Sequence, residues 1–307
     1  MTKRFNLFLV IAALLIALPY YWFLLDNSGS QVPAKPVSMA QLRALAQSMP
    51  GARPHAIEIE VPAFQRLPGN LLVAGSGIKR KLVAYMAFRL PVAGGKPIMM
   101  ESGLAASDAQ AIGAEQFKPD VAARVNRALG QAGLILVTHE HPDHLGALVA
   151  HGGTALMQAA RLNPNQLPPS LWAARLPWRS GEVPPPRLGI SAPQAVAPGV
   201  VVIPAPGSHT PGSQMIYVQL ANGREYLFAG DIASFAQNWQ DLRGRSRLIE
   251  TWFAPQNRAE VFAWLHMVRA LKADTPGLTI VPGHDYEWLQ DPFNHTGVTI
   301  GFKLTEP

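Results

Sequence analysis

Leu-Ile-Leu-Val-Thr-His-Glu-His-Pro-Asp-His-Leu-Gly, residues 134–146, sets the architecture of this chain. Its first four residues are apolar and branched, with the length expected of a buried strand. Directly after them, His139, His141, Asp143 and His144 lie within six residues. A single histidine here would be interpreted as a solvated or hydrogen-bonded side chain. Four potential ligands at the end of a strand instead predict a metal site.

The spacing of these four side chains further indicates two metal ions. Alternate side chains of an extended segment share a face, so His139 and His141 can point to one ion. A bend at Pro142 lets Asp143 and His144 turn toward a second ion. A dinuclear site needs about seven protein ligands, of which this loop supplies four. The remaining ligands are expected downstream.

The composition restricts the chemistry of such a site. The 307 residues include no cysteine, which excludes disulfides, thiolate zinc ligands and a cysteine nucleophile. A metal must then be held by imidazole and carboxylate, which suits zinc first, with iron or manganese as alternatives. A hydrophobic content of 48% is enough for a large core. The net charge of +6 is spread along the chain, so no nucleic-acid partner is expected.

Two short basic clusters stand out against this even charge. One is Lys79-Arg80-Lys81, and the other comprises Arg243, Arg245 and Arg247. A solvated face is the favoured interpretation of both. The alternative is attraction to anionic lipid headgroups or to an anionic substrate.

The first 26 residues are a candidate membrane anchor. Lys3 and Arg4 precede an uncharged, mostly apolar run from Phe5 to Leu25, which as a helix spans on the order of 30 Å. The positive residues predict a single-pass inner-membrane protein with its amino terminus in the cytoplasm and the rest on the periplasmic, extracytoplasmic side. Because Pro19 interrupts the run, a cleaved signal peptide is the alternative. The length of the run and the lack of a small-x-small cleavage site favour the anchor.

The remaining chain divides into a linker with a short helix, residues 27–50, and one large domain, residues 51–307. Within that domain we expect helices at 120–130 and 259–272, a helix that begins at 145–150, and an irregular, proline-rich stretch at 152–198. The Asn222-Gly223 pair predicts a hairpin between two of the strands. The expected strands cover residues 55–61, 71–74, 81–90, 97–100, 134–137, 200–204, 214–220, 225–229 and 278–281.

Three further ligand candidates lie where strands are expected to end. His209 lies in Pro-Gly-Ser-His-Thr-Pro-Gly-Ser, Asp231 in Leu-Phe-Ala-Gly-Asp, and His284 in Ile-Val-Pro-Gly-His-Asp. Neighbouring glycines let the backbone bend close to an ion. Any one of these segments alone is commonly turn chemistry, but together they bring the number of ligand candidates to seven.

The ordered set resembles the metallo-β-lactamase superfamily, with its His-x-His-x-Asp-His loop, later His-Thr-Pro-Gly segment, Ala-Gly-Asp turn and terminal Pro-Gly-His. The resemblance covers about residues 98–286. It implies an α+β, four-layered αβ/βα sandwich, here with an N-terminal transmembrane helix, and makes residues 51–307 the catalytic domain. It also implies ligand roles: His139, His141 and His209 for one metal, Asp143, His144 and His284 for the other, and Asp231 bridging both.

The chain departs from the superfamily pattern at two places. Glu101-Ser102-Gly103 ends the strand before the site where many relatives have Asp first, and Ser208 is inserted before His209. Neither departure removes a ligand. Both affect the groups that orient the ligands.

The ligand set indicates a hydrolase. Two Zn²⁺ ions per chain would hold a hydroxide that attacks a small ester, lactone, thioester or amide substrate, with Asp143 or Asp231 as the catalytic proton shuttle. A phosphodiesterase or nuclease on the same scaffold, an iron-dependent dioxygenase and a non-catalytic module are the alternatives. The partners expected are a small-molecule substrate and, through the N-terminal helix, the membrane.

The walls of the substrate site are expected from two segments, residues 152–198 and residues 234–253. The first contains Trp172 and Trp178, which either face the metals or pack on the core. Candidate pocket residues elsewhere are Tyr217, Tyr226, Trp252 and Tyr286, with core packing favoured for the first two. The histidines outside the motif, which are His55, His151, His266 and His295, are expected to be structural or on the surface.

Overall fold

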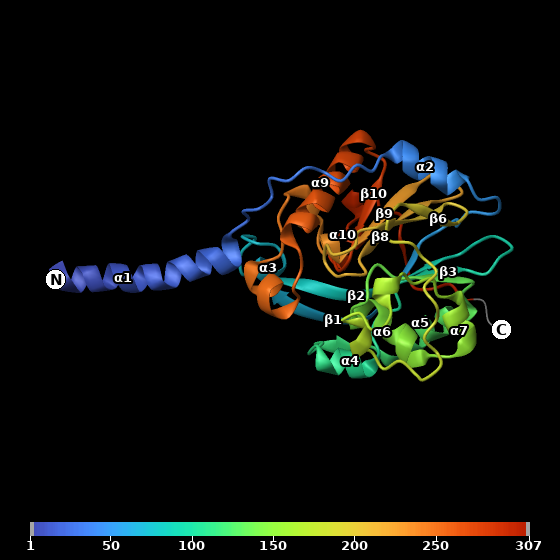
Figure 1. Cartoon of the computed structure of the whole chain (residues 1–307), viewed down its shortest axis with the longest axis horizontal. Helices are drawn as coiled ribbons and strands as arrows, with labels where there is room; N and C mark the ends of the chain where they lie inside the picture. The colour runs from blue at the N-terminus through green and yellow to red at the C-terminus, as the bar shows by residue number, and fades with distance from the viewer. Residues whose placement is uncertain (1–2, 305–307) are drawn as a thin grey trace.

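Two β-sheets packed face to face, with helices on both outer faces, form the body of the computed structural model, which describes residues 3–304 (Figure 1). The first sheet has the order β11-β1-β2-β3-β5, with β4 paired to β1. The second has the order β10-β9-β8-β7-β6. The strands are β1 Glu58–Pro68, β2 Arg80–Leu90, β3 Ile98–Met100, β4 Gln116–Phe117, β5 Leu134–Leu136, β6 Gln194–Ala197, β7 Val200–Pro204, β8 Gln214–Gln219, β9 Glu225–Gly230, β10 Thr279–Pro282 and β11 Thr299–Ile300. Each sheet mixes parallel and antiparallel pairs.

The helices lie between and after these strands. The α-helices are α1 Lys3–Tyr20, α2 Met39–Gln47, α3 Gly69–Leu72, α4 Ala106–Ala111, α5 Pro119–Gln131, α6 Pro142–His151, α7 Thr154–Ala159, α8 Ala236–Gln240, α9 Arg258–Asp274 and α10 Tyr286–Gln290. π-Helical turns cover Tyr21–Leu25 and Ile249–Phe253, and 3₁₀ turns cover Pro164–Gln166, Ala173–Arg175, Asp231–Ala233 and Pro292–Asn294.

Three buried apolar clusters hold the layers together. Between the sheets, Phe88 of β2 meets Phe228 of β9 with ring centroids 5.0 Å apart. On the outer face of the second sheet, α2 and α9 cover a cluster that includes Leu42 and Phe262. On the outer face of the first sheet, α5, α6 and α7 cover another that includes Ile135. The expected α+β fold is confirmed. Both of its sheets are mixed, and these contacts give it four layers.

The strand ends position the candidate ligands. In the second sheet β8 runs antiparallel to β7 and β9, whereas β10 is parallel to β9, so β7, β9 and β10 share one direction. Their carboxyl ends therefore lie along one edge of that sheet. The segments that follow β7, β9 and β10 carry His209, Asp231 and His284. The fourth segment, His139 to His144, follows β5 of the facing sheet.

Several expected elements differ in extent. Leu71–Ala74 is not a strand, because it lies in the connection between β1 and β2, where α3 forms a helical turn. The backbone amides of Gly69 and Asn70 donate across this loop to the carbonyls of Lys79 and Gly77. The helix after the metal loop begins at Pro142, a residue that suits the first helical position because it has no amide proton to leave unpaired. The first strand continues to Pro68.

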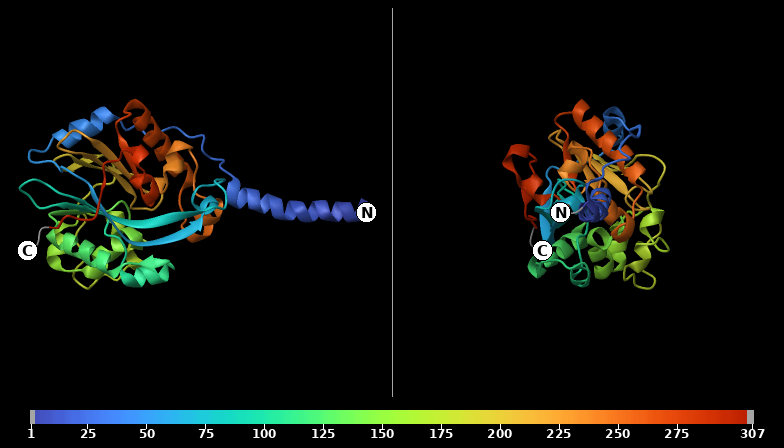
Figure 2. Two further views of the ribbon diagram at one scale, coloured as in Figure 1. Left: turned by 180° about the vertical axis from the view of Figure 1, so that it is seen from behind. Right: turned by 90° about the vertical axis from the view of Figure 1, so that its left-hand side faces the viewer.

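The N-terminal helix projects from one end of the domain (Figures 1 and 2). Lys3–Leu25 is a run of 23 residues that is long and apolar enough to cross a membrane, and none of its most apolar window is buried. A signal sequence fits the same description. At its carboxyl end, however, the segment contacts the folded domain, since Asp26 pairs with Arg247 at 2.6 Å.

Because α2 packs on the second sheet, we expect it to contribute to stability rather than to act as a linker. Leu42 is fully buried there, and Leu42→Ala should lower the free energy of unfolding by about 2–5 kcal/mol, measured by urea denaturation. Gln41→Ala, on the exposed face of the same helix, is the control and should change it by about 0.5 kcal/mol or less. Equal stability of the two variants would contradict this role of α2.

Candidate metal centre

The seven candidate ligands meet at one buried place between the sheets. Three overlapping groups each have their ligand atoms within 4.8 Å of one another. The groups are His139, His141, His209 and Asp231; His139, Asp143 and His144; and His144, Asp231 and His284. The structure thus brings together every residue of the predicted set.

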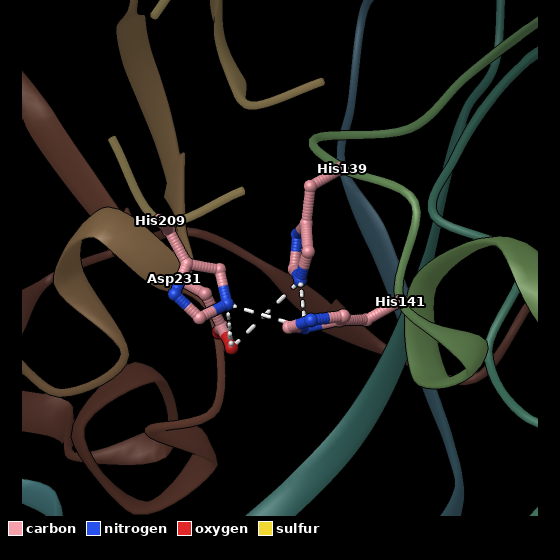
Figure 3. A group of neighbouring side chains, drawn as sticks. All are labelled: His139, His141, His209 and Asp231. Atoms are coloured by element: carbon pink, nitrogen blue, oxygen red, sulfur yellow. Dashed lines mark hydrogen bonds and ion pairs between the residues drawn. The ribbon is translucent and has the colours of Figure 1, made fainter. Parts of the chain in front are cut away.

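The first group surrounds one point (Figure 3). Nε2 of His139 and Nε2 of His209 lie 3.0 Å and 3.2 Å from Nδ1 of His141. Oδ2 of Asp231 lies 3.4 Å from His209 Nε2 and 3.9 Å from His139 Nε2. In a tetrahedral zinc site with Zn–N bonds of about 2.0–2.1 Å, neighbouring ligand nitrogens are about 3.3 Å apart. The three imidazoles therefore have the spacing of ligands around one ion.

The second group uses the other oxygen of Asp231. Its Oδ1 lies 2.9 Å from His284 Nε2 and 3.8 Å from His144 Nε2. Oδ2 of Asp143 lies 3.4 Å from both of these nitrogens. Asp231 thus faces both groups through different oxygens, as a bridging carboxylate would. The two groups match the two predicted ligand sets.

Hydrogen bonds behind the rings fix which nitrogen carries the proton. Nδ1 of His284 donates to the carbonyl of Ala84 at 2.8 Å. Likewise, Nδ1 of His144 lies 3.1 Å from a carboxylate oxygen of Glu101 and donates to it. In the neutral rings, these partners leave the lone pair on Nε2, and Nε2 of His144 is buried without a hydrogen-bond partner. Converging lone pairs that face carboxylates suit a cation between them, so these residues fit a metal.

The third orienting group is Gln256. Its amide oxygen lies 2.9 Å from Nδ1 of His209, and its amide nitrogen donates to Glu250 at 2.7 Å. Glu250 in turn pairs with Arg258 at the start of α9. The direction of the His209 ring is therefore set from the segment before α9, which is remote in sequence.

The pKa values separate the two groups. Burial lowers the pKa of His141 to about 4, and it also holds the pKa of His139 and His209 well below the ordinary value. These rings are neutral near pH 7, as metal ligands must be. Burial alone would lower the pKa of His144 as well, but Glu101 and Asp143 raise it above its ordinary value. A negative potential thus exists where the second ion would lie.

Glu140 joins the two ligand loops although it faces away from the centre. Its side chain accepts hydrogen bonds from Thr210 Oγ1 at 2.7 Å and from the amide of Gly212 at 3.1 Å. Burial raises the pKa of this carboxyl. A Cβ at Gly212 would lie 2.5 Å from a carboxylate oxygen of Glu140, so glycine is required for this approach. The contact holds the His209 loop against the loop that follows β5.

The departures at Glu101 and Ser208 both have structural roles. Glu101 is buried and adopts the left-handed backbone conformation with φ 60°, which points its carboxylate at His144 and at the amide of Thr138. Ser208 is buried, and its hydroxyl donates to the carbonyl of Ala205 at 2.7 Å, which closes the turn before His209. Neither change displaces a ligand.

Arg245 makes one of the contacts that the sequence interpretation missed. It donates to Asp231 Oδ2 at 2.5 Å and to Ser234 Oγ at 2.6 Å. Burial alone would raise the pKa of Asp231, but the charges of His284 and Arg245 hold it well below its usual range. The interpretation of Arg243, Arg245 and Arg247 as a solvated face is wrong, because all three make specific contacts.

The aromatic candidates divide clearly. The ring of Trp172 lies edge-on to that of His141, with the ring centroids 4.5 Å apart, so Trp172 faces the centre. Trp178 instead packs on the core beneath the first sheet. Tyr217 and Tyr226 are buried in the second sheet. Tyr85, which the sequence did not suggest, lies with its ring centroid 5.6 Å from that of His284.

A cavity of about 680 Å³ adjoins the centre. Asp143 and Tyr85 line it together with Gln65 and with apolar side chains from β1, α4 and the 248–254 segment. Burial raises the pKa of Tyr85, as do Asp143 and Asp231, so its hydroxyl remains protonated.

Comparison with known proteins supports the fold. No family model matches the chain, and no curated protein sequence matches it either. Among solved structures, an N-acyl homoserine lactone lactonase matches with a TM-score of 0.58 and 18% identity, covering 78% of this chain and 96% of that one. The chain has the metallo-β-lactamase fold. The predicted resemblance to that superfamily is thus confirmed for the fold.

Two further structures with the metallo-β-lactamase fold are similar. An N-acyl homoserine lactone hydrolase, with the product N-hexanoyl-L-homoserine bound at its catalytic metal center, has a TM-score of 0.57 and 18% identity and covers 76% of this chain and 95% of its own. A protein from Staphylococcus aureus, described as a probable metal-dependent hydrolase, has a TM-score of 0.56 and 14% identity. That match covers 77% of this chain and 91% of the other.

Because Gln256 fixes the tautomer of His209 alone, we expect Gln256→Leu to weaken one metal selectively. The affinity for an ion at the group of His139, His141 and His209 should fall by about 10–100-fold, measured by competition with a chromophoric chelator. Gln158→Leu, on an exposed helical position, is the control and should bind both ions normally. Equal weakening of both ions would contradict the selective role of Gln256.

Proposed function

We propose that this protein is a metal-dependent hydrolase with a dinuclear zinc centre held by the seven residues described above. The observation that carries the proposal is Asp231, whose two oxygens face two separate imidazole groups. Two divalent ions bound there would supply a water of lowered pKa as the nucleophile and polarise the attacked carbonyl. The fold and the lactone-cleaving structures that share it support the same class of reaction.

The proposed substrate is a small ester, lactone, thioester or amide rather than a phosphodiester. Among the described residues that line the cavity beside the centre, none is Lys or Arg, and most are apolar. A phosphodiester or nucleic acid would require cationic groups along that wall. The apolar wall suits an uncharged acyl group.

The two aspartates have different parts in this proposal. Both oxygens of Asp231 are engaged, one beside His284 and the other with Arg245, so Asp231 positions the ions. Asp143 also lines the cavity, where its carboxylate can reach a bound substrate. We therefore assign proton transfer to the leaving group to Asp143, and Tyr85 and Gln65 offer hydrogen bonds to the polar part of the substrate.

Asp143→Asn tests this assignment. The turnover number should fall by about 100-fold or more because general acid catalysis is lost, while metal content, measured by mass spectrometry, shows how many ions remain. The control is His55→Ala, an exposed histidine outside the centre, which should retain full activity. Normal turnover of a fully metal-loaded Asp143→Asn variant would contradict the role of Asp143.

The reaction class is tested on the purified full chain. Assays would use a lactone, a carboxylic ester, a thioester, an amide and a phosphodiester, before and after chelation and with zinc added back. We expect cleavage of at least one acyl substrate, its loss on chelation and its recovery with zinc. Activity confined to the phosphodiester, or oxygen consumption by a stoichiometrically iron-loaded protein, would overturn the proposal in favour of the corresponding alternative.

We also propose that the N-terminal segment remains attached as a single-pass inner-membrane anchor, with residues 27–50 connecting it to the catalytic domain at 51–307 on the periplasmic side. Support comes from the end of the segment, where Arg247 binds Asp26 and lies over the ring of Trp22 at 4.2 Å. Cleavage after residue 26 would remove these contacts.

The anchor is tested by the mass of the protein recovered from membranes. The expected result is the uncleaved mass, together with extraction by detergent but not by salt, because burial of the mostly apolar 23-residue segment holds the protein in the bilayer. A shortened, salt-extractable form would show instead that the segment is a signal peptide.

A further inference from the structure

The cavity beside the metal centre has two chemically different ends. Asp143, Tyr85 and Gln65 are its polar lining residues, and the contact of Tyr85 with His284 places this part next to the candidate ligands. The rest of the wall is apolar and is formed by Leu67, Leu71, Ile112, Leu248, Ile249 and Phe253. A pocket of about 680 Å³ with this distribution matches an amphiphile, with its polar group toward the centre and its aliphatic part away from it.

The apolar wall extends to the molecular surface. Its segment Ile249–Phe253 carries two large apolar side chains toward solvent, with Trp252 58% and Phe253 67% exposed. On the neighbouring loop between β1 and β2, Ile78 is 73% exposed. Large apolar groups that gather on a surface indicate a contact with another apolar phase.

The N-terminal segment ends at this same surface. The ring of Phe23 lies 4.9 Å from that of Trp252, and the amide of Gly75, in the loop that carries Ile78, donates to the carbonyl of Leu24 at 3.0 Å. Arg258 donates to the carbonyl of Asp26 at 3.0 Å. Figure 1 shows α1 leaving the domain beside α3 and the 249–253 turn. The end of the anchor and the outer wall of the cavity are therefore fixed to one another.

A membrane around α1 would accordingly lie against the mouth of the cavity. Tyr21 and Trp22, both exposed, are at the position where aromatic rings favour the membrane interface. Trp252 and Ile78 would then lie at a similar depth because they flank the same helix end. Lys79, exposed beside Ile78, would meet the headgroups, where a cation is attracted to anionic lipids.

We propose that the cavity admits the aliphatic chain of an amphiphilic ester directly from the bilayer, so that the substrate is a membrane-partitioned acyl ester or lactone. This inference rests on the proposed hydrolase function and names its substrate class. In the reaction, the oxygen of water bonds to the acyl carbon, the bond from that carbon to the ester oxygen breaks, and the ester oxygen leaves with a proton as the alcohol. No further reactant is required.

The first arm of the test measures the dependence of activity on chain length. The zinc-loaded full chain in detergent is assayed on nitrophenyl esters from butanoate to dodecanoate, kept below their aggregation concentrations. Each added methylene buried in the cavity should raise kcat/KM by about three- to fourfold until the cavity is filled. Ile249→Trp, which narrows the cavity, should lower kcat/KM for dodecanoate far more than for butanoate and so flatten this rise.

The second arm tests access from the bilayer. The full chain is reconstituted in phosphatidylcholine–phosphatidylglycerol vesicles that contain the dodecanoate ester. The double variant Ile78→Ser, Trp252→Ser should lose about tenfold in activity on the vesicle-bound ester but none on soluble butanoate. Ile300→Ser is the matched control, since Ile300 is 61% exposed and β11 pairs with the end of β1 opposite to α3.

A third measurement does not depend on activity. Brominated lipids should quench the tryptophan fluorescence of the reconstituted protein, and Trp252→Phe should remove part of that quenching. Cleavage of butanoate with no chain-length dependence, or a double variant as active on vesicles as the wild type, overturns this inference alone. Failure to cleave any ester, butanoate included, overturns the proposed function itself.

Discussion

The constraint on which the structure depends is the burial of five imidazoles and two carboxylates against one another. Two of these groups, Asp231 and His284, approach to 2.9 Å, and three imidazole nitrogens lie within 3.2 Å of a neighbour. Buried polar groups at such distances are stable only when a proton or a cation lies between them and when hydrogen bonds hold their outer sides. Glu101, Gln256 and the carbonyl of Ala84 supply those outer bonds. The two sheets thus serve to carry these orienting groups as well as the ligands.

The candidate ligands could be grouped from the sequence because the segments that carry them follow short apolar strands. His139 follows β5, and Asp231 follows β9, so the strand pattern and the ligand pattern reinforce each other locally. The fold followed from the same signals together with the superfamily resemblance. The strand expected at Leu71–Ala74 was wrong because an apolar run does not reveal whether it pairs or turns, and here the loop amides bind the loop's own carbonyls.

The groups that orient the ligands could not be predicted in the same way. Arg245 lies in an evenly basic stretch, and only the folded chain shows that it reaches Asp231 whereas Arg247 reaches Asp26. Gln256 lies 47 positions from His209 and belongs to no motif. Tyr85 lies on β2, whose residues are mostly buried. Its sequence neighbours therefore do not distinguish a residue that lines the cavity beside the centre from an ordinary core residue. Contacts of this kind depend on how distant loops meet, which one sequence does not encode locally.

One short stretch links the N-terminal segment to the candidate metal centre. Arg245 binds the carboxylate of Asp231, and two positions later Arg247 binds Asp26 at the end of the N-terminal segment. Arg258 contacts both segments, since it donates to the carbonyl of Arg245 and to the carbonyl of Asp26. A displacement of the N-terminal segment relative to the second sheet would have to break one of these charge-assisted contacts. Because such contacts are costly to leave unpaired, the position of the N-terminal segment and the position of Asp231 are set by neighbouring arginines of one stretch.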